Sequence, residues 1–237
     1  MAGELKNSNE YQRKFIANVS HDFRSPLTSI KGYAEAIRDG VVPYEMQDKY
    51  LGIIVSESER LTKLSREMLT LEKVDPMTAM LNPSVFNLNA MIKETSEAFG
   101  SACLSKNIVI NLLLEGEEIY VRADYSRIQQ VLYNLIDNAI KFSKKDSSIE
   151  IETSTLKNKA RISVKDHGAG IASSDLPKIW ERFYKTDPSR GRDPKGTGLG
   201  LSIVKDIIQA HNQKISVIST PGIGSEFTFT LDLAQEV

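Results

Sequence analysis

Apolar residues in the first 73 positions follow helical spacing. They recur at intervals of three and four, which places them on one face of a long amphipathic helix. A second stripe with the same spacing follows Asp39, Gly40 and Pro43, residue types that end a helix and form a turn. The first stripe comprises Phe15, Ile16, Val19, Phe23, Leu27, Ile30, Ala34 and Ile37, and the second comprises Leu51, Ile54, Ser58, Leu61, Ser65 and Met68.

Two such helices joined by a short turn form a hairpin whose apolar stripes are too long for one hairpin to cover. Association of two hairpins into a four-helix bundle buries these stripes, so we expect residues 1–75 to form a homodimer. An alternative stays open from the pattern alone: the hairpin can lie as a helical cap on the second part of the same chain.

The pattern of apolar residues changes after residue 75. Residues 76–84 contain two prolines and no clear periodicity, so they are predicted to be a linker. From 85 to 237, helices interspersed with strand pairs indicate a two-layer α/β sandwich. The predicted helices span 88–105, 125–142 and 199–210, and the predicted strands span 108–114, 119–123, 149–153, 160–166, 215–219 and 226–233.

The composition of the chain argues against several classes of protein. The 237 residues carry 30 Lys and Arg against 31 Asp and Glu, and the net charge of -1 gives no support to a basic face for nucleic acid. A single Cys103 excludes an intrachain disulfide, and no paired cysteines indicate structural zinc. No run of about 18 apolar residues and no signal-peptide pattern is present. The sequence predicts a soluble chain, which can still be a fragment of a longer protein.

His21 lies off the apolar stripe of the first predicted helix. At about 100° per residue it sits roughly 160° from Phe23, so we expect it to face solvent or a partner. Asp22 can hold one imidazole proton and leave the other nitrogen free as a nucleophile, while Ser25 lies one turn further along the same face. Pro26 removes a backbone donor and can kink the helix. The competing interpretation is an ordinary solvated helix face.

Three polar residues follow one edge of the predicted helix 125–142. Asn134, Asn138 and Lys141 fall within roughly 60° of one another on a stripe beside the apolar one. An amide oxygen suits Mg²⁺ and an ammonium group suits phosphate, so this edge is a candidate nucleotide site, although a plain polar flank is the alternative. The apolar stripe comprises Ile128, Val131, Leu132, Leu135, Ile136 and Ala139.

Two glycine-containing segments extend the candidate site. Asp166 ends a predicted strand and precedes Gly168 and Gly170, so a carboxylate can meet an adenine amino group where the backbone can approach closely. Residues 196–201 read Gly-Thr-Gly-Leu-Gly-Leu and open a predicted helix, whose amide groups and dipole can bind phosphate. They form neither a P-loop nor a Rossmann fingerprint. The cationic segment 186–195 is predicted to be a lid.

These segments together resemble the catalytic core of the two-component sensor histidine kinases. Asp22 stands where the family more often has Glu, and Ser25 where it has Thr, and both keep the chemistry. His167 and His211 gain no catalytic role from the resemblance. Six motifs occur in the family's order over nearly the whole chain: the H box around His21, the N box at 134–142, the first glycine box at 166–170, the aromatic F box at 180–184, the second glycine box at 196–201 and a glycine pair at 222–224.

The resemblance implies ATP-dependent autophosphorylation of His21 and phosphoryl transfer to an aspartate of a response regulator receiver domain. Asp22 would orient His21 and act as base, and we expect Ser25 to support dephosphorylation of the regulator. Asn138 would coordinate Mg²⁺, and Asp166 would bind the adenine amino group. The other residues expected at the ATP site are Asn134, Lys141, Phe142, Gly168, Gly170, Lys195, Gly196, Thr197, Gly198, Leu199 and Gly200.

The resemblance also implies a homodimer in the cytoplasm that binds no nucleic acid and reaches a membrane only through segments absent from this sequence. One alternative is an ATPase or protein serine kinase of the same nucleotide-binding superfamily, to which type II topoisomerases also belong. That alternative explains the second half of the chain and does not explain His21. The other alternative is a non-enzymatic dimeric interaction module, and the intact Asn138, Asp166 and glycine boxes argue against it.

Overall fold

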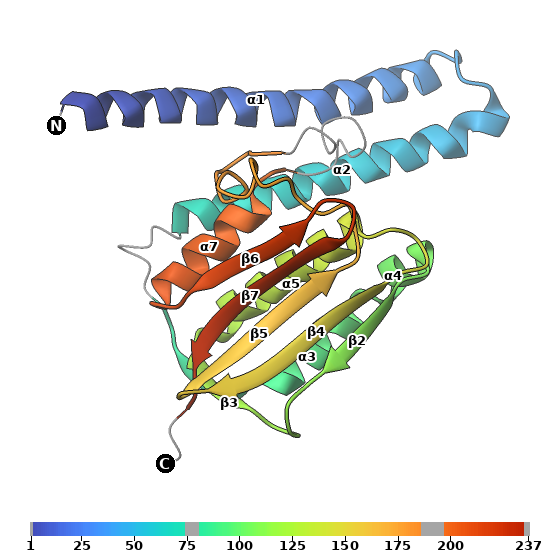
Figure 1. The fold of residues 1–237 in the computed structure, drawn as a ribbon. Coiled ribbons are helices and arrows are strands. Elements are labelled where there is room, and N and C mark those ends of the chain that lie inside the picture. The colour runs from blue at the N-terminus through green and yellow to red at the C-terminus, as the bar shows by residue number, and fades with distance from the viewer. Residues whose placement is uncertain (1, 74–80, 186–196, 235–237) are drawn as a thin grey trace.

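The chain begins with a helical hairpin, as the apolar pattern predicts (Figure 1). In the computed structural model, α1 spans Ala2–Arg38 and α2 spans Tyr44–Lys73. Gly40 adopts a φ of +72° in the turn between the helices, a conformation that glycine reaches without steric cost. No described helix combines the length and the hydropathy that a membrane crossing requires. The structure describes residues 2–73, 81–185 and 197–234.

The hairpin packs against the second part of the chain through one face of its helices. Leu64 on α2 is 2% exposed and belongs to the same hydrophobic cluster as the second part, with Phe23 and Met68 packed against it. The predicted alternative of a helical cap therefore accounts for part of the apolar surface. Leu27 and Leu51, which lie in the two predicted stripes, remain 52% and 47% exposed in the single chain.

The second part is an α/β sandwich, which confirms the predicted fold class (Figure 1). Its five-stranded sheet has the order β2-β4-β5-β7-β6, in which β2 runs parallel to β4 and every other pair is antiparallel. The strands are β2 Val109–Leu113, β4 Ser148–Leu156, β5 Lys159–Asp166, β6 Ile215–Thr220 and β7 Gly224–Asp232. The helices are α3 Leu88–Glu97, α4 Gly100–Lys106, α5 Tyr125–Phe142 and α7 Gly200–Ala210.

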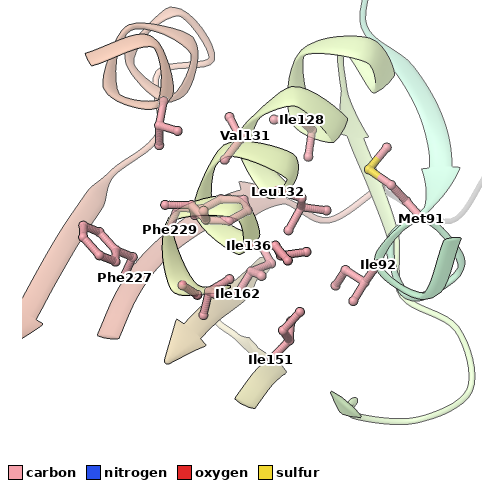
Figure 2. Close-up of a cluster of buried hydrophobic side chains, with 14 of the residues drawn as sticks. Met91, Ile92, Ile128, Val131, Leu132, Ile136, Ile151, Ile162, Phe227 and Phe229 are labelled. Atoms are coloured by element: carbon pink, nitrogen blue, oxygen red, sulfur yellow. The ribbon is translucent and has the colours of Figure 1, made fainter. Parts of the chain in front are cut away.

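The core lies between one face of the sheet and helices α3, α5 and α7. Figure 2 shows Ile128, Val131, Leu132 and Ile136 of α5 directed toward apolar side chains of the strands, among them Phe229. The whole predicted apolar stripe of α5 is buried, so its direction is confirmed. Burial of this stripe sets the rotation of α5 about its own axis, and with it the direction of the polar edge that carries the candidate site.

Two local features differ from the predicted pattern. The helix predicted over 88–105 is broken, because α3 ends at Glu97 and α4 begins at Gly100, a residue with low helix propensity. A short strand β1, Ser84–Asn87, pairs antiparallel with β3, Tyr120–Ala123, in a separate two-stranded sheet. Four residues give too short a pattern to identify, and the pairing partner is distant in sequence. Residues 74–80 of the predicted linker lie outside the described residues.

Candidate functional site

The candidate phosphoacceptor lies on the outer face of α1. The His21 side chain is 81% exposed, which confirms its predicted outward direction, and its Nδ1 atom lies 3.5 Å from Oδ1 of Asp22. Ser25 is exposed one turn further along the helix, and Pro26 is buried. Because Pro26 has no N–H group, it cannot donate the helical hydrogen bond to the carbonyl of Asp22.

Asp22 also contacts the second part of the chain. Its Oδ2 atom accepts a hydrogen bond from Nζ of Lys185 at 3.2 Å, and the two side chains are only 16% and 22% exposed. One carboxylate therefore faces His21 with one oxygen and Lys185 with the other. The sequence analysis did not identify Lys185 as a site residue. The one feature of the sequence that could have indicated it is its position directly after the aromatic run 180–184.

The carboxylate of Asp166 lies at the end of β5 and is 6% exposed. Burial raises the pKa of Asp166, against the opposing effect of backbone hydrogen bonds from Gly168 and Ser225. Oδ1 accepts the N–H of Gly168 at 2.8 Å. The carboxyl group is thus fixed in direction at the strand end, where the sequence analysis expected adenine recognition.

The first glycine loop packs against the end of α5. A Cβ atom added at Gly168 would lie 2.2 Å from the carbonyl oxygen of Phe142, far inside contact distance. The same carbonyl accepts the N–H of Ala169 at 3.3 Å. Only glycine fits at position 168, and this close approach holds the N-box helix and the Asp166 loop together. Gly170, with a φ of +67°, continues the same turn.

Asn134 and Asn138 face the start of α7. Asn134 is 8% exposed, and its Nδ2 donates to the carbonyl oxygen of Gly200 at 3.4 Å. A Cβ atom at Gly200 would lie 3.9 Å from Nδ2 of Asn138, so both amides flank this glycine. The predicted polar edge of α5 and the second glycine box are therefore adjacent, although they are more than 60 residues apart in sequence.

The start of α7 is tied to the aromatic run. The N–H of Phe183 donates to the carbonyl oxygen of Gly198 at 2.8 Å, and these two residues have φ values of +65° and +73°. Oγ1 of the buried Thr197 accepts the N–H of Leu199 at 3.3 Å. The first N–H groups of α7 lie next to Asn134, and a helix start of this kind binds phosphate.

Several predicted site residues have other positions or cannot be placed. The side chain of Leu199 is fully buried in the core, so only its backbone is available to a ligand. Lys141 lies with Nζ 5.1 Å from the ring centroid of Phe142, which is 40% exposed. Lys195 and Gly196, and with them the whole of the predicted lid 186–195, lie outside the described residues.

The donor groups at this site fit a Mg²⁺ ion carried by a nucleotide. Among the described residues, no group of three or more His, Cys, Asp or Glu side chains converges as a metal site. Mg²⁺ commonly keeps several waters and binds through substrate phosphates with one or two protein oxygens. The amide oxygen of Asn138, beside the phosphate-binding start of α7, suits that arrangement.

Two family models match this chain in the same order as its two parts. Residues 11–76 match the His Kinase A (phospho-acceptor) domain. Residues 123–235 match the histidine kinase-, DNA gyrase B-, and HSP90-like ATPase model. The first range contains His21, and the second contains Asn134, Asn138, Asp166 and Gly200.

Individual proteins are similar over most of the chain. Sensor protein kinase WalK of Staphylococcus aureus is 34% identical over 223 residues, which cover 93% of this chain and 53% of that protein. The chain spans 36% of the WalK sequence from strain JH9, so it is about half the length of its curated relatives or less.

Solved structures show the same arrangement of the two parts. The Acinetobacter baumannii histidine kinase AdeS superposes with a TM-score of 0.73 at 28% identity, covering 91% of this chain and 98% of that one. Histidine kinase ThkA, solved in complex with response regulator protein TrrA, superposes with a TM-score of 0.78 at 30% identity, covering 97% of this chain and 64% of that one.

The close approach at Gly168 generates a prediction about nucleotide binding. The substitution Gly168→Ala should weaken binding of a non-hydrolysable ATP analogue by about tenfold or more, equivalent to ~1.4 kcal/mol, because the added methyl group separates the Asp166 loop from α5. Isothermal titration calorimetry measures the effect. The matched control is Gly32→Ala, where nothing lies within 4 Å of the added atom. Wild-type affinity in Gly168→Ala would contradict this role of the glycine.

Proposed function

Because this chain belongs to the two-component sensor histidine kinases, we propose that it transfers the γ-phosphoryl group of ATP to His21 and passes it to an aspartate of a response regulator. One observation carries the proposal: an exposed imidazole at His21 lies beside the poorly exposed carboxylate of Asp22. That carboxylate is joined by an ion pair to the part of the chain that matches the ATPase model, so acceptor and nucleotide site lie on facing parts of one molecule.

The proposed reaction uses the two ring nitrogens of His21 differently. Asp22 faces Nδ1, which leaves the Nε2 lone pair free to attack the γ-phosphorus. A bond forms from Nε2 to phosphorus while the bond to the β,γ-bridging oxygen breaks, and its electron pair leaves with ADP. The Nδ1 proton passes to Asp22, so the product is a neutral phosphohistidine ring. Catalysis of this kind depends on positioning and charge stabilisation.

The second part of the chain supplies the nucleotide site in this proposal. Asp166 would accept the adenine amino group, and its carboxylate is already fixed by the N–H of Gly168. The start of α7, with Asn134 beside it, would hold the phosphates, and Lys141 on α5 would add positive charge to them. Asn138 would hold Mg²⁺, which supplies charge neutralisation on the phosphate oxygens when it is bound.

Transfer to a receiver-domain aspartate is proposed as the second step. The similar kinase ThkA has been solved in complex with a response regulator, which supports a partner of this class. The exposed face of α1 that carries His21 and Ser25 would meet the regulator. Ser25 can orient a water for attack on the regulator's aspartyl phosphate, so the same face would also support dephosphorylation.

We propose a homodimer through the hairpin and a cytoplasmic location, as part of a longer sensor. The exposed Leu27 and Leu51 support the dimer, because packing against the second part of the chain leaves these stripe residues uncovered. The alternative of an ATPase or serine kinase without phosphohistidine chemistry would leave His21 without a role. Acid lability of the phosphoprotein separates the two, since phosphohistidine is acid-labile and phosphoserine is not.

The substitution His21→Ala should abolish acid-labile phosphorylation while nucleotide affinity changes less than about twofold, because the imidazole lies outside the nucleotide-binding part. Incubation with γ-labelled Mg-ATP followed by acid treatment measures the first quantity, and calorimetry with an ATP analogue measures the second. Thr28→Ala, at another exposed position of α1, is the control and should retain the label. Retention of acid-labile label in His21→Ala would disprove the assignment.

Substitutions at Asp22 and Ser25 should separate the forward and reverse reactions. Asp22→Asn should slow autophosphorylation by about tenfold or more because it removes the proposed base. Ser25→Ala should slow regulator dephosphorylation more than autophosphorylation. Both rates are measured with a receiver domain as substrate. Thr28→Ala is the control, since its hydroxyl is also exposed but donates to the carbonyl of Arg24 at 2.9 Å. Equal losses of both rates in Ser25→Ala would indicate helix disruption instead.

The proposed dimer should be sensitive to charge at the uncovered stripe. Leu51→Lys places an ammonium group in the bundle and should raise the dimer dissociation constant by about 100-fold, since burial of an unpaired charge is strongly unfavourable. Analytical ultracentrifugation over a concentration series measures the constant. Leu156→Lys, at a 70% exposed position on β4, should leave it unchanged. A wild-type chain that is monomeric at micromolar concentration would contradict the dimer.

A further inference from the structure

His211 joins the distal ends of the two helices that carry the nucleotide site. It is the C-cap residue of α7, and its Nε2 atom accepts the backbone N–H of Asp124, the N-cap residue of α5, at 3.0 Å. At the opposite end of α7, the carbonyl oxygen of Gly200 accepts a hydrogen bond at 3.4 Å from Nδ2 of Asn134, which lies in the middle of α5. The helices are therefore antiparallel neighbours tied by a hydrogen bond near each end of α7.

The partners of His211 determine its tautomer. A backbone N–H group can only donate, so Nε2 must present a lone pair to Asp124. Nδ1 lies 2.8 Å from the carbonyl oxygen of Ile207, which can only accept, so the ring proton is on Nδ1. Both ring nitrogens form hydrogen bonds, so the position of the ring along the axis of α7 is fixed.

Asp124 is itself fixed by three further bonds. Its Oδ1 accepts the N–H of Arg127 at 3.2 Å and the hydroxyl of Ser126 at 2.8 Å, and its Oδ2 accepts the N–H of Asn82 at 3.0 Å. Burial opposes ionisation of Asp124, but these hydrogen bonds lower its pKa below the ordinary value. The backbone N–H that His211 contacts thus belongs to a residue that is held in place at the start of α5.

Helices α5 and α7 pack against each other. The hydrophobic attraction between apolar surfaces is non-directional, and side-chain interdigitation limits sliding without fixing it to one atom pair. A hydrogen bond at the distal end adds a directional constraint on the axial position of α7. Asp124 and Asn138 are 14 positions apart on α5, about 21 Å at 1.5 Å per residue, and a rigid helix transmits an axial displacement over that length.

We propose that His211 is a positioning residue that sets the axial register of α7 against α5, and so places the phosphate-binding start of α7 opposite Asn134 and Asn138. This inference rests on the nucleotide site proposed above. It concerns assembly of the site, because His211 lies at the C-terminal end of α7 and beside the start of α5, away from the residues proposed to hold the nucleotide.

Two polar substitutions at position 211 separate positioning from simple packing. Gln places its amide oxygen as many bonds from the backbone as Nε2 of histidine, so His211→Gln can still accept the N–H of Asp124. Asn reaches only as far as Nδ1, so His211→Asn keeps a donor for Ile207 and loses the bond to Asp124. We expect the Kd of the full chain for a Mg-ATP analogue to rise about fivefold in His211→Asn, the equivalent of about one hydrogen bond, and to stay within twofold in His211→Gln.

Kinetic and spectroscopic measurements test whether His211 acts by positioning the start of α7. In His211→Asn, KM for ATP should rise with little change in kcat, and the amide resonance of Gly200 should shift although it is at the other end of α7. His211→Gln should restore both. Equal affinities in the two variants would overturn the proposal, as would a Gly200 resonance that is unmoved in His211→Asn.

The ring tautomer supplies a test that needs no variant. A long-range nitrogen–proton spectrum of the wild-type chain should show His211 protonated on Nδ1, and protonation on Nε2 would overturn the proposal even where His211→Asn fails to fold.

Asn138→Ala separates this inference from the proposed function, since it should remove Mg-dependent nucleotide binding while the His211 tautomer stays the same. Absence of nucleotide binding in the wild type would count against the function, and the Gly200 shift would still decide the role of His211.

Discussion

Burial of one apolar stripe of α5 is the constraint on which the rest of the structure depends. Once Ile128, Leu132 and Ile136 face the sheet, the rotation of the helix is set, and the amides of Asn134 and Asn138 must face α7. The end of the same helix presents the Phe142 carbonyl to the glycine loop after Asp166. One packing interface therefore brings three motifs together that are far apart in the chain.

Features with a long, regular period were predictable from the sequence, and contacts between distant segments were not. The bounds of α5 coincide with the predicted 125–142, because its apolar repeat runs uninterrupted between two clear ends. The break between α3 and α4 and the four-residue β1 depend on local packing, which a periodic pattern does not record. The site residues could be predicted because their side chains have the chemistry that ATP and Mg²⁺ require. The pairs Asp22–Lys185 and Asp124–His211 could not be predicted, because they join residues that are far apart in sequence and meet only in the folded chain.

Asp22 is the point at which the two parts of the chain depend on each other. Its two oxygens face an imidazole on α1 and an ammonium group that follows the aromatic run. In this arrangement the carboxylate faces both groups at once, one with each oxygen. Any displacement of the nucleotide-binding part along the hairpin moves Lys185 relative to Asp22, so the electrostatic surroundings of the carboxylate beside His21 depend on how the two parts are placed.

The left-handed backbone of Phe183 stores conformational energy in the aromatic run. A bulky residue at a φ of +65° costs about 1–3 kcal/mol relative to an extended or helical conformation. The N–H of Phe183 donates to the carbonyl oxygen of Gly198, two residues before the start of α7. A strained backbone of this kind persists only where the surrounding structure holds it in place. Because this strained residue donates to the Gly198 carbonyl, the conformational energy of the aromatic run depends on where the start of α7 lies.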